Sequence, residues 1–455
     1  MEKPTLPSGT RDFGPDVMAK RRFILNTIST VFQAFGFQPL ETPAMENLST
    51  LTGKYGEEGD QLLFKILNTG DFLKEIDKSN LAEINAKKLT PVIAEKGLRY
   101  DLTVPFARFV VMNRNEITFP FRRYQIQPVW RADRPQKGRY REFYQCDADV
   151  IGTRSLICEA EIILMIKSVF SKLGISDYTI KINHRGVLSG IAEAIDARTN
   201  ETALFVAIDK LDKIGEDGVK KELLSKGFDE KSLTSLFEIL NIKGSTAEKL
   251  TTLEAKLASG EAGKKGIEDL STVLSLLGSY GSDEEHVEFD IALARGLSYY
   301  TGCIFEVKIH NVSIGSVGGG GRYDNLTKAF GDKENLPGVG FSFGVDRIYD
   351  AMEALQLFPK DAATSSKVLV CHFDDESFRY GLGLLAKLRS EGIACEIYPD
   401  VTKLKKQLDF ANKKRIPYTI VVGSDEMQSG MLAFKDMGKG EQEKLDIAGI
   451  IGRLK

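Results

Sequence analysis

The stretch from residue 122 to residue 152 combines residue types that suit the binding of an anion. Between Arg122 and Arg141, seven basic side chains stand against a single acid, Asp133. The basic residues are Arg122, Arg123, Arg131, Arg134, Lys137, Arg139 and Arg141. Arginine grips phosphate through two parallel N–H bonds, which lysine does not offer. The charge pattern favours a phosphate-bearing ligand, although a solvated basic hairpin would have the same composition.

Directly after this basic stretch, polar residues alternate at Gln145, Asp147 and Asp149. Side chains on a strand repeat every second residue, so these three share one face. A cationic loop beside a face that bears carboxylates suits a substrate with both a phosphate and an amine.

A β-hairpin is the element expected to position these groups. Residues 124–130 and 142–151 are typical of strands, and Pro135 and Gly138 break the loop 132–140 between them. The order WRADRP at 130–135 followed by GRYREF at 138–143 resembles motif 2 of class II aminoacyl-tRNA synthetases, in the histidyl-tRNA synthetase version.

Further ordered blocks along the chain carry the same resemblance. They are GTRDF at 9–13, LRYDLT at 98–103, ARGLSYY at 294–300, GGGGRYD at 318–324 and GVGFSFGVDR at 338–347, the last resembling motif 3. A helix ending before Gly36, then an extended segment up to Pro43, resembles motif 1, the dimer interface of that class. The resemblance implies a homodimer that activates L-histidine with ATP and Mg²⁺ and transfers it to tRNA(His).

The resemblance also implies roles for individual residues. Arg131 holds the α-phosphate, Arg139 the outer phosphates and Arg347 the adenine, with Gly340 also on the ATP side; Arg131 and Arg295 are catalytic. The histidine contacts are Asp101, Thr103, Gln145, Asp149, Tyr299, Tyr300 and Tyr323, with Asp101 and Gln145 on the α-amino group and Asp149 and Tyr300 on the imidazole. Arg134 and Gln136 face the tRNA acceptor end. Which residues hold the metal ion is left open.

The glycine run at 318–321 admits two interpretations. Glycines let a ligand approach the backbone closely, but a tight turn at a strand edge uses them equally. The spacing of a Rossmann or Walker loop is absent. The neighbouring Arg295 and Tyr300 favour a role in lining the substrate site.

The predicted fold is α+β, with a class II antiparallel sheet flanked by helices. Residues 1–186 form the first part of a catalytic core and residues 285–357 the second. Between them, residues 187–284 read as a helical insertion, over the tRNA acceptor arm or as a mere spacer. After a linker, residues 365–455 alternate strand and helix and resemble an α/β anticodon-binding domain. Two short strands are also expected at 62–67 and 90–94.

Composition limits the other possibilities. The 455 residues carry a net charge of −3, so RNA contacts must use local basic patches. The N-terminus lacks a signal-peptide core, and no apolar run is long enough for a membrane span. Five cysteines without a CxxC pair indicate neither a zinc knuckle nor a disulfide framework, and a reducing cytoplasm is expected.

Two other functions remain alternatives. A non-catalytic regulatory paralogue of histidine biosynthesis keeps the fold but usually loses motif residues and the C-terminal domain. A class II synthetase for threonine, proline or glycine would lack the ARGLSYY block and the acid at 149. Amino-acid-dependent ATP–pyrophosphate exchange separates all three.

Overall fold

The computed structural model describes residues 3–54, 56–74, 85–258, 260–282, 284–294, 300–332, 334–359 and 366–455. The chain divides into two compact units. One comprises residues 1–12 and 24–357, and the other comprises residues 13–23 and 358–455.

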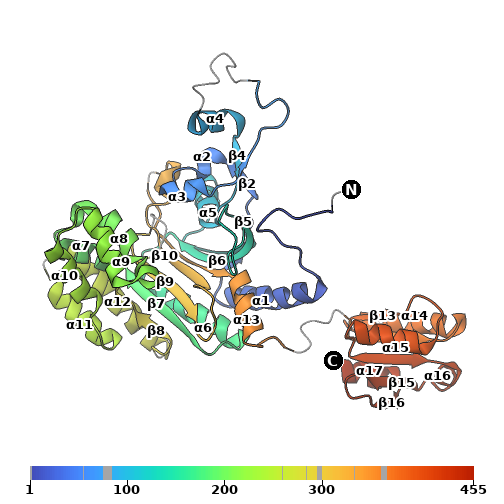
Figure 1. The fold of residues 1–455 in the computed structure, drawn as a ribbon. Helices are drawn as coiled ribbons and strands as arrows, with labels where there is room; N and C mark the ends of the chain where they lie inside the picture. The colour runs from blue at the N-terminus through green and yellow to red at the C-terminus, as the bar shows by residue number, and fades with distance from the viewer. Residues whose placement is uncertain are drawn as a thin grey trace. The chain divides into compact units, whose positions relative to one another are not determined.

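The first unit is built on a large, mainly antiparallel sheet (Figure 1). Among the described residues it has eight strands in the order β1-β5-β6-β11-β10-β9-β7-β8, with parallel pairs only at its edges, β1 with β5 and β7 with β8. The strands are β1 (Gln38–Pro39), β5 (Phe121–Trp130), β6 (Glu142–Ile151), β7 (Tyr178–His184), β8 (Val287–Phe289), β9 (Cys303–Ile309), β10 (Gly318–Arg322) and β11 (Gly338–Gly344). The predicted hairpin is confirmed as β5 and β6.

Strand β6 gives the sheet two chemically different faces. Gln145, Asp147 and Asp149 are polar residues at alternate positions, whereas Cys146 and Ala148 between them are fully buried apolar residues. This alternation is the pattern of a strand with a core on one side and a polar site on the other. The three predicted polar side chains therefore share one face, as expected.

Helices α1 (Pro15–Ala34), α6 (Ile157–Leu173) and α13 (Val345–Ala354) accompany the central strands. Phe32 of α1 and Phe170 of α6 both pack against Phe343 of β11, with ring centroids 6.0 and 6.1 Å apart. Helix α6 ends at Gly174, whose φ of +73° is a left-handed C-cap that glycine adopts without strain.

A small three-stranded sheet precedes the hairpin, in the order β2-β4-β3. Its elements are β2 (Met45–Asn47), β3 (Lys65–Ile66) and β4 (Lys96–Leu98), with α2 (Leu48–Leu51), α3 (Gly56–Gln61), α4 (Ala86–Ile93) and α5 (Thr103–Met112) around it. The strand expected at 90–94 is wrong, because residues up to Ile93 finish helix α4 and the pairing strand begins at Lys96. Helix α5 begins at Thr103, after Leu102 as the N-cap residue, and the Asp101 carboxylate accepts from the Val104 N–H in its first turn at 3.1 Å.

Residues 185–279 form a cluster of helices beside β7, β8 and β9 (Figure 1). They are α7 (Arg185–Ala194), α8 (Glu201–Ile208), α9 (Leu211–Ser225), α10 (Glu230–Leu240), α11 (Thr246–Lys256) and α12 (Glu261–Ser279), with a 3₁₀ turn at Arg198–Asn200. Helices α7 and α12 approach closely where Gly190 faces Gly263. The predicted helical character is confirmed, and strands are lacking in the described part of this stretch.

The second unit contains a separate mixed sheet in residues 366–455, all of which are described. Its order is β13-β12-β14-β15-β16, parallel among the first three strands and antiparallel after β14. The elements are β12 (Val368–His372), α14 (Asp375–Ser390), β13 (Cys395–Ile397), α15 (Leu404–Lys413), β14 (Tyr418–Val422), α16 (Ser424–Ser429), β15 (Leu432–Asp436), β16 (Gln442–Leu445) and α17 (Ile447–Leu454). Its own apolar core, including Val370, Leu385 and Phe434, is that of an independent α/β domain.

None of the described helices combines the length and apolar character that crossing a membrane requires. All five cysteines are buried free thiols.

Candidate active site

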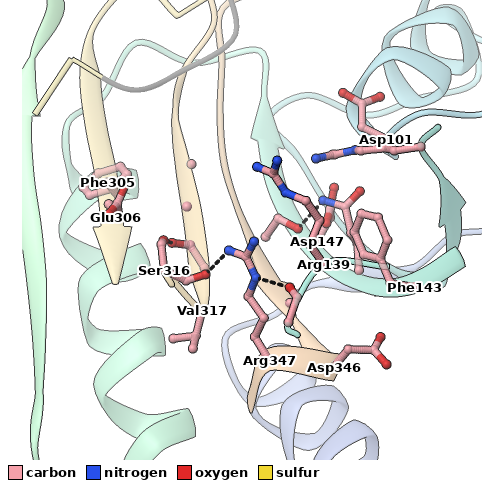
Figure 2. Close-up of a pocket in the computed structure, with 18 of the residues that line it drawn as sticks. Asp101, Arg139, Phe143, Asp147, Phe305, Glu306, Ser316, Val317, Asp346 and Arg347 are labelled. Atoms are coloured by element: carbon pink, nitrogen blue, oxygen red, sulfur yellow. Dashed lines mark hydrogen bonds between the residues drawn. The ribbon is translucent and has the colours of Figure 1, made fainter. Parts of the chain in front are cut away.

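A cavity of about 300 Å³ opens on the polar face of the large sheet. This size is at the lower end of the range for small-molecule sites. Figure 2 shows Asp101, Phe143 and Asp147 along one side, with Phe305 and Glu306 of β9 opposite them. Cations and carboxylates both line the cavity, as the sequence pattern predicted.

The loop between β5 and β6 closes in a tight turn. Backbone bonds join Gln136 and Arg139 in both directions, and Gly138 between them has a φ of +73°. Arg131, at the base of the loop, donates its Nε to the Tyr100 carbonyl at 3.0 Å and lies 4.2 Å over the Tyr100 ring. The Arg131 guanidinium is therefore held in a fixed position at the cavity wall.

Arg139 is held more loosely than Arg131. Its side chain is 47 % exposed and lies 3.6 Å from the Asp133 carboxylate. An exposed ion pair of this length contributes little stability. Arg139 is thus free to reorient toward an incoming anion.

The N-terminal block GTRDF braces this loop from outside. Arg11 pairs with the Asp346 carboxylate, and its guanidinium lies 3.2 Å over the Tyr140 ring. Asp346 also accepts from the Tyr144 N–H at 3.2 Å, and the Gly9 carbonyl accepts from the Arg141 N–H at 2.9 Å. The N-terminal block, the loop between β5 and β6, and the start of α13 are therefore in contact with one another behind the cavity.

Arg347, in the first turn of α13, bridges two walls of the cavity (Figure 2). Its Nε donates to the Gly138 carbonyl at 2.8 Å and its Nη1 to the Ser316 carbonyl at 2.5 Å. A guanidinium fixed at both ends presents a flat face to a ligand, which suits stacking on an aromatic base.

The glycine run forms most of strand β10 rather than a turn. Gly318, Gly319 and Gly320 line the cavity, and a Cβ at Gly319 would approach only the Phe305 carbonyl, at 3.4 Å. A side chain at this position would occupy ligand space, so its absence leaves room for the substrate. The alternative of a tight turn at a strand edge does not apply, and the position of Gly319 agrees with the expected lining role.

Deeper in the sheet lies an inner pocket of about 20 Å³, enough for a water molecule. There Asp149 pairs with the fully buried Arg123, nitrogen to oxygen 2.8 Å, and accepts from the Tyr323 hydroxyl at 2.6 Å. Gly340 lies against the Asp149 carboxylate, where a Cβ would collide with it. Gly340 therefore lines this inner pocket and not the main cavity in which Arg131 and Arg347 lie.

Asp147 lies where the two pockets meet, since it lines both of them together with Thr103 and Tyr300. Burial raises the pKa of Asp147 to about 7; Arg123 lowers this pKa, and the negative charge of Asp149 raises it further. Burial likewise raises the pKa of Asp149, with Arg123 and Tyr323 acting against the increase. Perturbed carboxyls in a cleft are typical of functional sites.

The structure brings most of the predicted site residues to these two pockets. The main cavity is lined by Asp101, Thr103, Arg131, Arg139, Gln145, Tyr300 and Arg347, and the inner pocket by Asp149, Tyr323 and Gly340. Arg134 and Gln136 are exposed on the loop, outside both pockets. Arg295 and Tyr299 lie outside the described residues, so their predicted roles stay predictions.

Other pocket residues were not predicted from the sequence. Strand pairing places Ser342 beside Asp147 and Glu306 beside Gly319, so both side chains line the cavity. Phe143 lines it because it directly follows the loop. Arg123 could have been found, since Arg123, Gln125 and Gln127 are polar at alternate positions of a strand. Strand pairing itself is not visible in the sequence.

Comparisons with known proteins agree with this geometry. A family model described as Histidyl-tRNA synthetase matches residues 90–348, and one described as Anticodon binding domain matches residues 367–455. The chain is 57 % identical over 454 residues to the Histidine--tRNA ligase of Cytophaga hutchinsonii and 53 % identical over 452 residues to that of Bacteroides fragilis, each alignment covering at least 99 % of both chains.

Solved structures give the same result for the fold. The histidyl-tRNA synthetase of Nostoc sp. superposes with a TM-score of 0.85 at 30 % identity over 100 % of both chains. A Bacillus halodurans structure named as an ATP phosphoribosyltransferase regulatory subunit/histidyl-tRNA synthetase, at 23 % identity and a TM-score of 0.71, covers 90 % of this chain and 97 % of its own and shares the fold. On the family model and the full-length relatives together, the chain belongs to the histidyl-tRNA synthetase family.

Proposed function

We propose that this protein is a histidine--tRNA ligase, which activates L-histidine with ATP and transfers it to the 3′ end of tRNA(His). The observation that carries the proposal is one cavity that joins a fixed cation, Arg131, to the buried carboxylates Asp101 and Asp147. A cation and carboxylates side by side match the phosphate and the amine of an aminoacyl-adenylate. The names of the full-length relatives support the choice of amino acid.

On the nucleotide side, the positions of the cations suggest an order of contacts. Arg347 stacks on the adenine, Arg131 holds the α-phosphate, and the mobile Arg139 follows the outer phosphates. Attack by the histidine carboxylate adds negative charge at the α-phosphorus, and fixed cations lower that barrier. Arg295 acts in the same step, and pyrophosphate leaves. Positioning, rather than a covalent enzyme intermediate, supplies the catalysis.

On the amino-acid side, Asp101, Thr103 and Gln145 receive the α-amino group, with Tyr299 lining the same region. Tyr300, Asp149 and Tyr323 read the imidazole nitrogens, a donor and an acceptor that apolar side chains cannot match. The inner pocket holds about 20 Å³, less than an imidazole ring needs. Histidine binding therefore widens this pocket, with Tyr300, which lines both pockets, as the side chain placed to move.

For tRNA, Arg134 and Gln136 stand on the exposed loop at the cavity rim and contact the acceptor end. The helical stretch 187–284 sits over the acceptor arm, and the C-terminal domain, residues 365–455, binds the anticodon. We retain residues 1–186 and 285–357 as the two parts of the catalytic core.

Mg²⁺ is proposed to enter with the triphosphate. Within the described residues there is no group of three His, Cys, Asp or Glu side chains that could hold a metal ion. Mg²⁺ is commonly held by one or two carboxylates together with substrate phosphates.

A homodimer in the cytoplasm is proposed as the working form. Helix α1 leads into β1, which is the edge strand of the large sheet and pairs with β5 through residues 38 and 39 alone. This is the helix–strand order of motif 1. Light scattering on the purified protein tests the dimer. The cytoplasm follows from the proposed substrates, since tRNA charging takes place there.

ATP–pyrophosphate exchange measured with each of the twenty amino acids tests the function. Exchange that depends on histidine, followed by charging of tRNA(His), is the expected result. Exchange with threonine, proline or glycine instead would identify a different synthetase. No exchange with any amino acid would favour a regulatory paralogue. The presence of Arg131, Arg347 and the C-terminal domain argues against that alternative.

A further inference from the structure

Asp147 is a buried carboxylate at the centre of the site, to which neither the sequence motifs nor the roles above give a task. It is 2 % exposed, and within the described residues its Oδ1 meets no hydrogen-bond donor. A buried carboxylate oxygen without a hydrogen-bond donor destabilises the fold unless a ligand supplies the donor. Asp147 lines both the main cavity and the inner pocket.

The surroundings of Asp147 hold more negative than positive charge. Asp149 and Asp101 both act on it unfavourably, whereas the cation Arg123 and a hydrogen bond with the Ser342 side chain act on it favourably. Arg123 already pairs with Asp149 at 2.8 Å, and the Asp101 carboxylate already accepts from the Val104 N–H of helix α5. The described part of the site therefore leaves one carboxylate for a cation that the ligand must bring.

Strand register shows where that cation would lie. Asp147 is level with Ser342 on β11, which is level with Gly319 on β10, and Gly319 is level with Glu306 on β9. Ser342 and Gly319 are small, so they form an open floor about 14 Å long between the two acids, from three strand spacings. Gln145 and Asp101, the expected amine contacts, line the cavity at the Asp147 end.

We infer that Asp147 is a specificity-determining residue that pairs with the α-ammonium group of the bound amino acid. This inference rests on the proposed function. It gives the two β6 carboxylates different contacts: Asp147 binds the amine, and Asp149, which lies deeper in the sheet, binds the imidazole. Asp101, Thr103 and Gln145, the amine contacts proposed above, line the same cavity, and Asp147 adds a buried carboxylate to them. Ligands with a protonated amine are favoured over otherwise equal ligands that lack it.

Three ligands separate the amine from the imidazole: L-histidine, histidinol and imidazolepropionate, which has no amine. Their Kd values are measured by calorimetry at pH 8 on the full chain, with wild-type protein and Asp147→Asn. The variant is expected to bind histidine and histidinol about 10- to 100-fold more weakly, the effect of a lost charge-assisted hydrogen bond. Binding of imidazolepropionate is expected to be unchanged.

Glu306→Gln is the matched control, because it removes a second buried carboxylate from the same cavity at the far end of the floor. It is expected to leave all three Kd values unchanged. If Glu306→Gln weakened binding of the two amines as much as Asp147→Asn does, the cause would be the lower negative charge of the whole cavity and not a contact with Asp147. The inference would then fail. Asp147→Ser, which is smaller, repeats the test if the asparagine variant does not fold.

The remaining outcomes are equally decisive. If Asp147→Asn weakened binding of all three ligands equally, Asp147 would contact the imidazole and not the amine. If it weakened none of them, Asp147 would have a structural role only. Either result overturns the inference. If wild-type protein bound none of the three, the proposed function would fail first and take the inference with it. Wild-type binding of histidine with an unaltered variant would overturn the inference alone.

Discussion

At the scale of single residues, the titration of Asp147 gives a prediction that needs no ligand. Burial raises its pKa from 3.8 to about 7, so the folded protein holds a proton there that the unfolded chain has lost. The stabilisation from that proton is complete below about pH 4 and is lost as the pH rises through about 7. Asp147→Asn should therefore melt at a higher temperature than wild type at pH 8.

The difference in melting temperature between Asp147→Asn and wild type should shrink as the pH is lowered from 8 to 5. Calorimetric melts across this range measure it. A constant difference at every pH would mean that Asp147 does not titrate in the folded protein near neutral pH.

Asp149 occupies a different environment, and its replacement should act on two properties. Asp149→Asn removes the acceptor proposed for the imidazole and leaves the buried Arg123 without its charge partner. KM for histidine should rise by about 10- to 100-fold with KM for ATP unchanged. The melting temperature should fall, because an unpaired buried charge is costly.

Tyr323→Phe removes only the hydroxyl that bonds to Asp149, so it keeps the ion pair with Arg123. It should raise KM for histidine with a smaller change in melting temperature. Unchanged KM for histidine in both variants would assign Asp149 to the structure alone.

Arg295 is predicted from its block in the sequence, as its position is outside the described residues. A cation that acts only on the transition state should be dispensable for folding. Arg295→Ala should keep its melting temperature yet lose adenylate formation by about 10²- to 10³-fold. Arg295→Lys should recover little, because a point charge does not reproduce the guanidinium fork. Near-normal exchange by the folded alanine variant would contradict the catalytic role.

At the scale of elements, the packing of α7 on α12 depends on glycine. A Cβ at Gly190 would lie 2.7 Å from the Gly263 Cα, so the two helix backbones would have to separate. Gly190→Ala should destabilise the protein by about 1–3 kcal/mol, as overpacking of a core does. Urea unfolding measures the change.

Gly278→Ala provides the control within α12. A Cβ at Gly278 meets nothing within 4 Å, so alanine should be neutral or slightly stabilising through its helix propensity. If Gly278→Ala lowered the free energy of unfolding as much as Gly190→Ala, the loss would come from replacing a helical glycine as such and not from the contact between α7 and α12.

At the scale of the whole molecule, the cavity residues and the C-terminal sheet belong to different compact units. Removal of residues 365–455 should therefore leave histidine-dependent pyrophosphate exchange largely intact, while tRNA charging is impaired. Both rates are measured on the same preparation, with a melt and light scattering to establish that the shortened chain is folded and has kept its oligomeric state. Loss of exchange with normal tRNA binding by that folded chain would contradict the division of roles.

The sequence by itself determined the hairpin, the shared face of Gln145, Asp147 and Asp149, the helical stretch and the α/β alternation after residue 366. These follow from local signals, namely side-chain alternation, turn residues and helical periodicity. The motif blocks likewise identified the family. The strand expected at 90–94 failed because a short apolar run suits a strand or a helix equally until its partners are known.

Only the tertiary structure decided which distant residues meet. The pair Arg123–Asp149, the brace from Arg11 to Asp346 and the row from Asp147 to Glu306 all depend on strand register and on chain segments many residues apart. Register is fixed by the packing of whole faces, and no local pattern specifies it. For the same reason, the sequence could place Asp147 on a polar face but could not reveal a buried oxygen between two pockets.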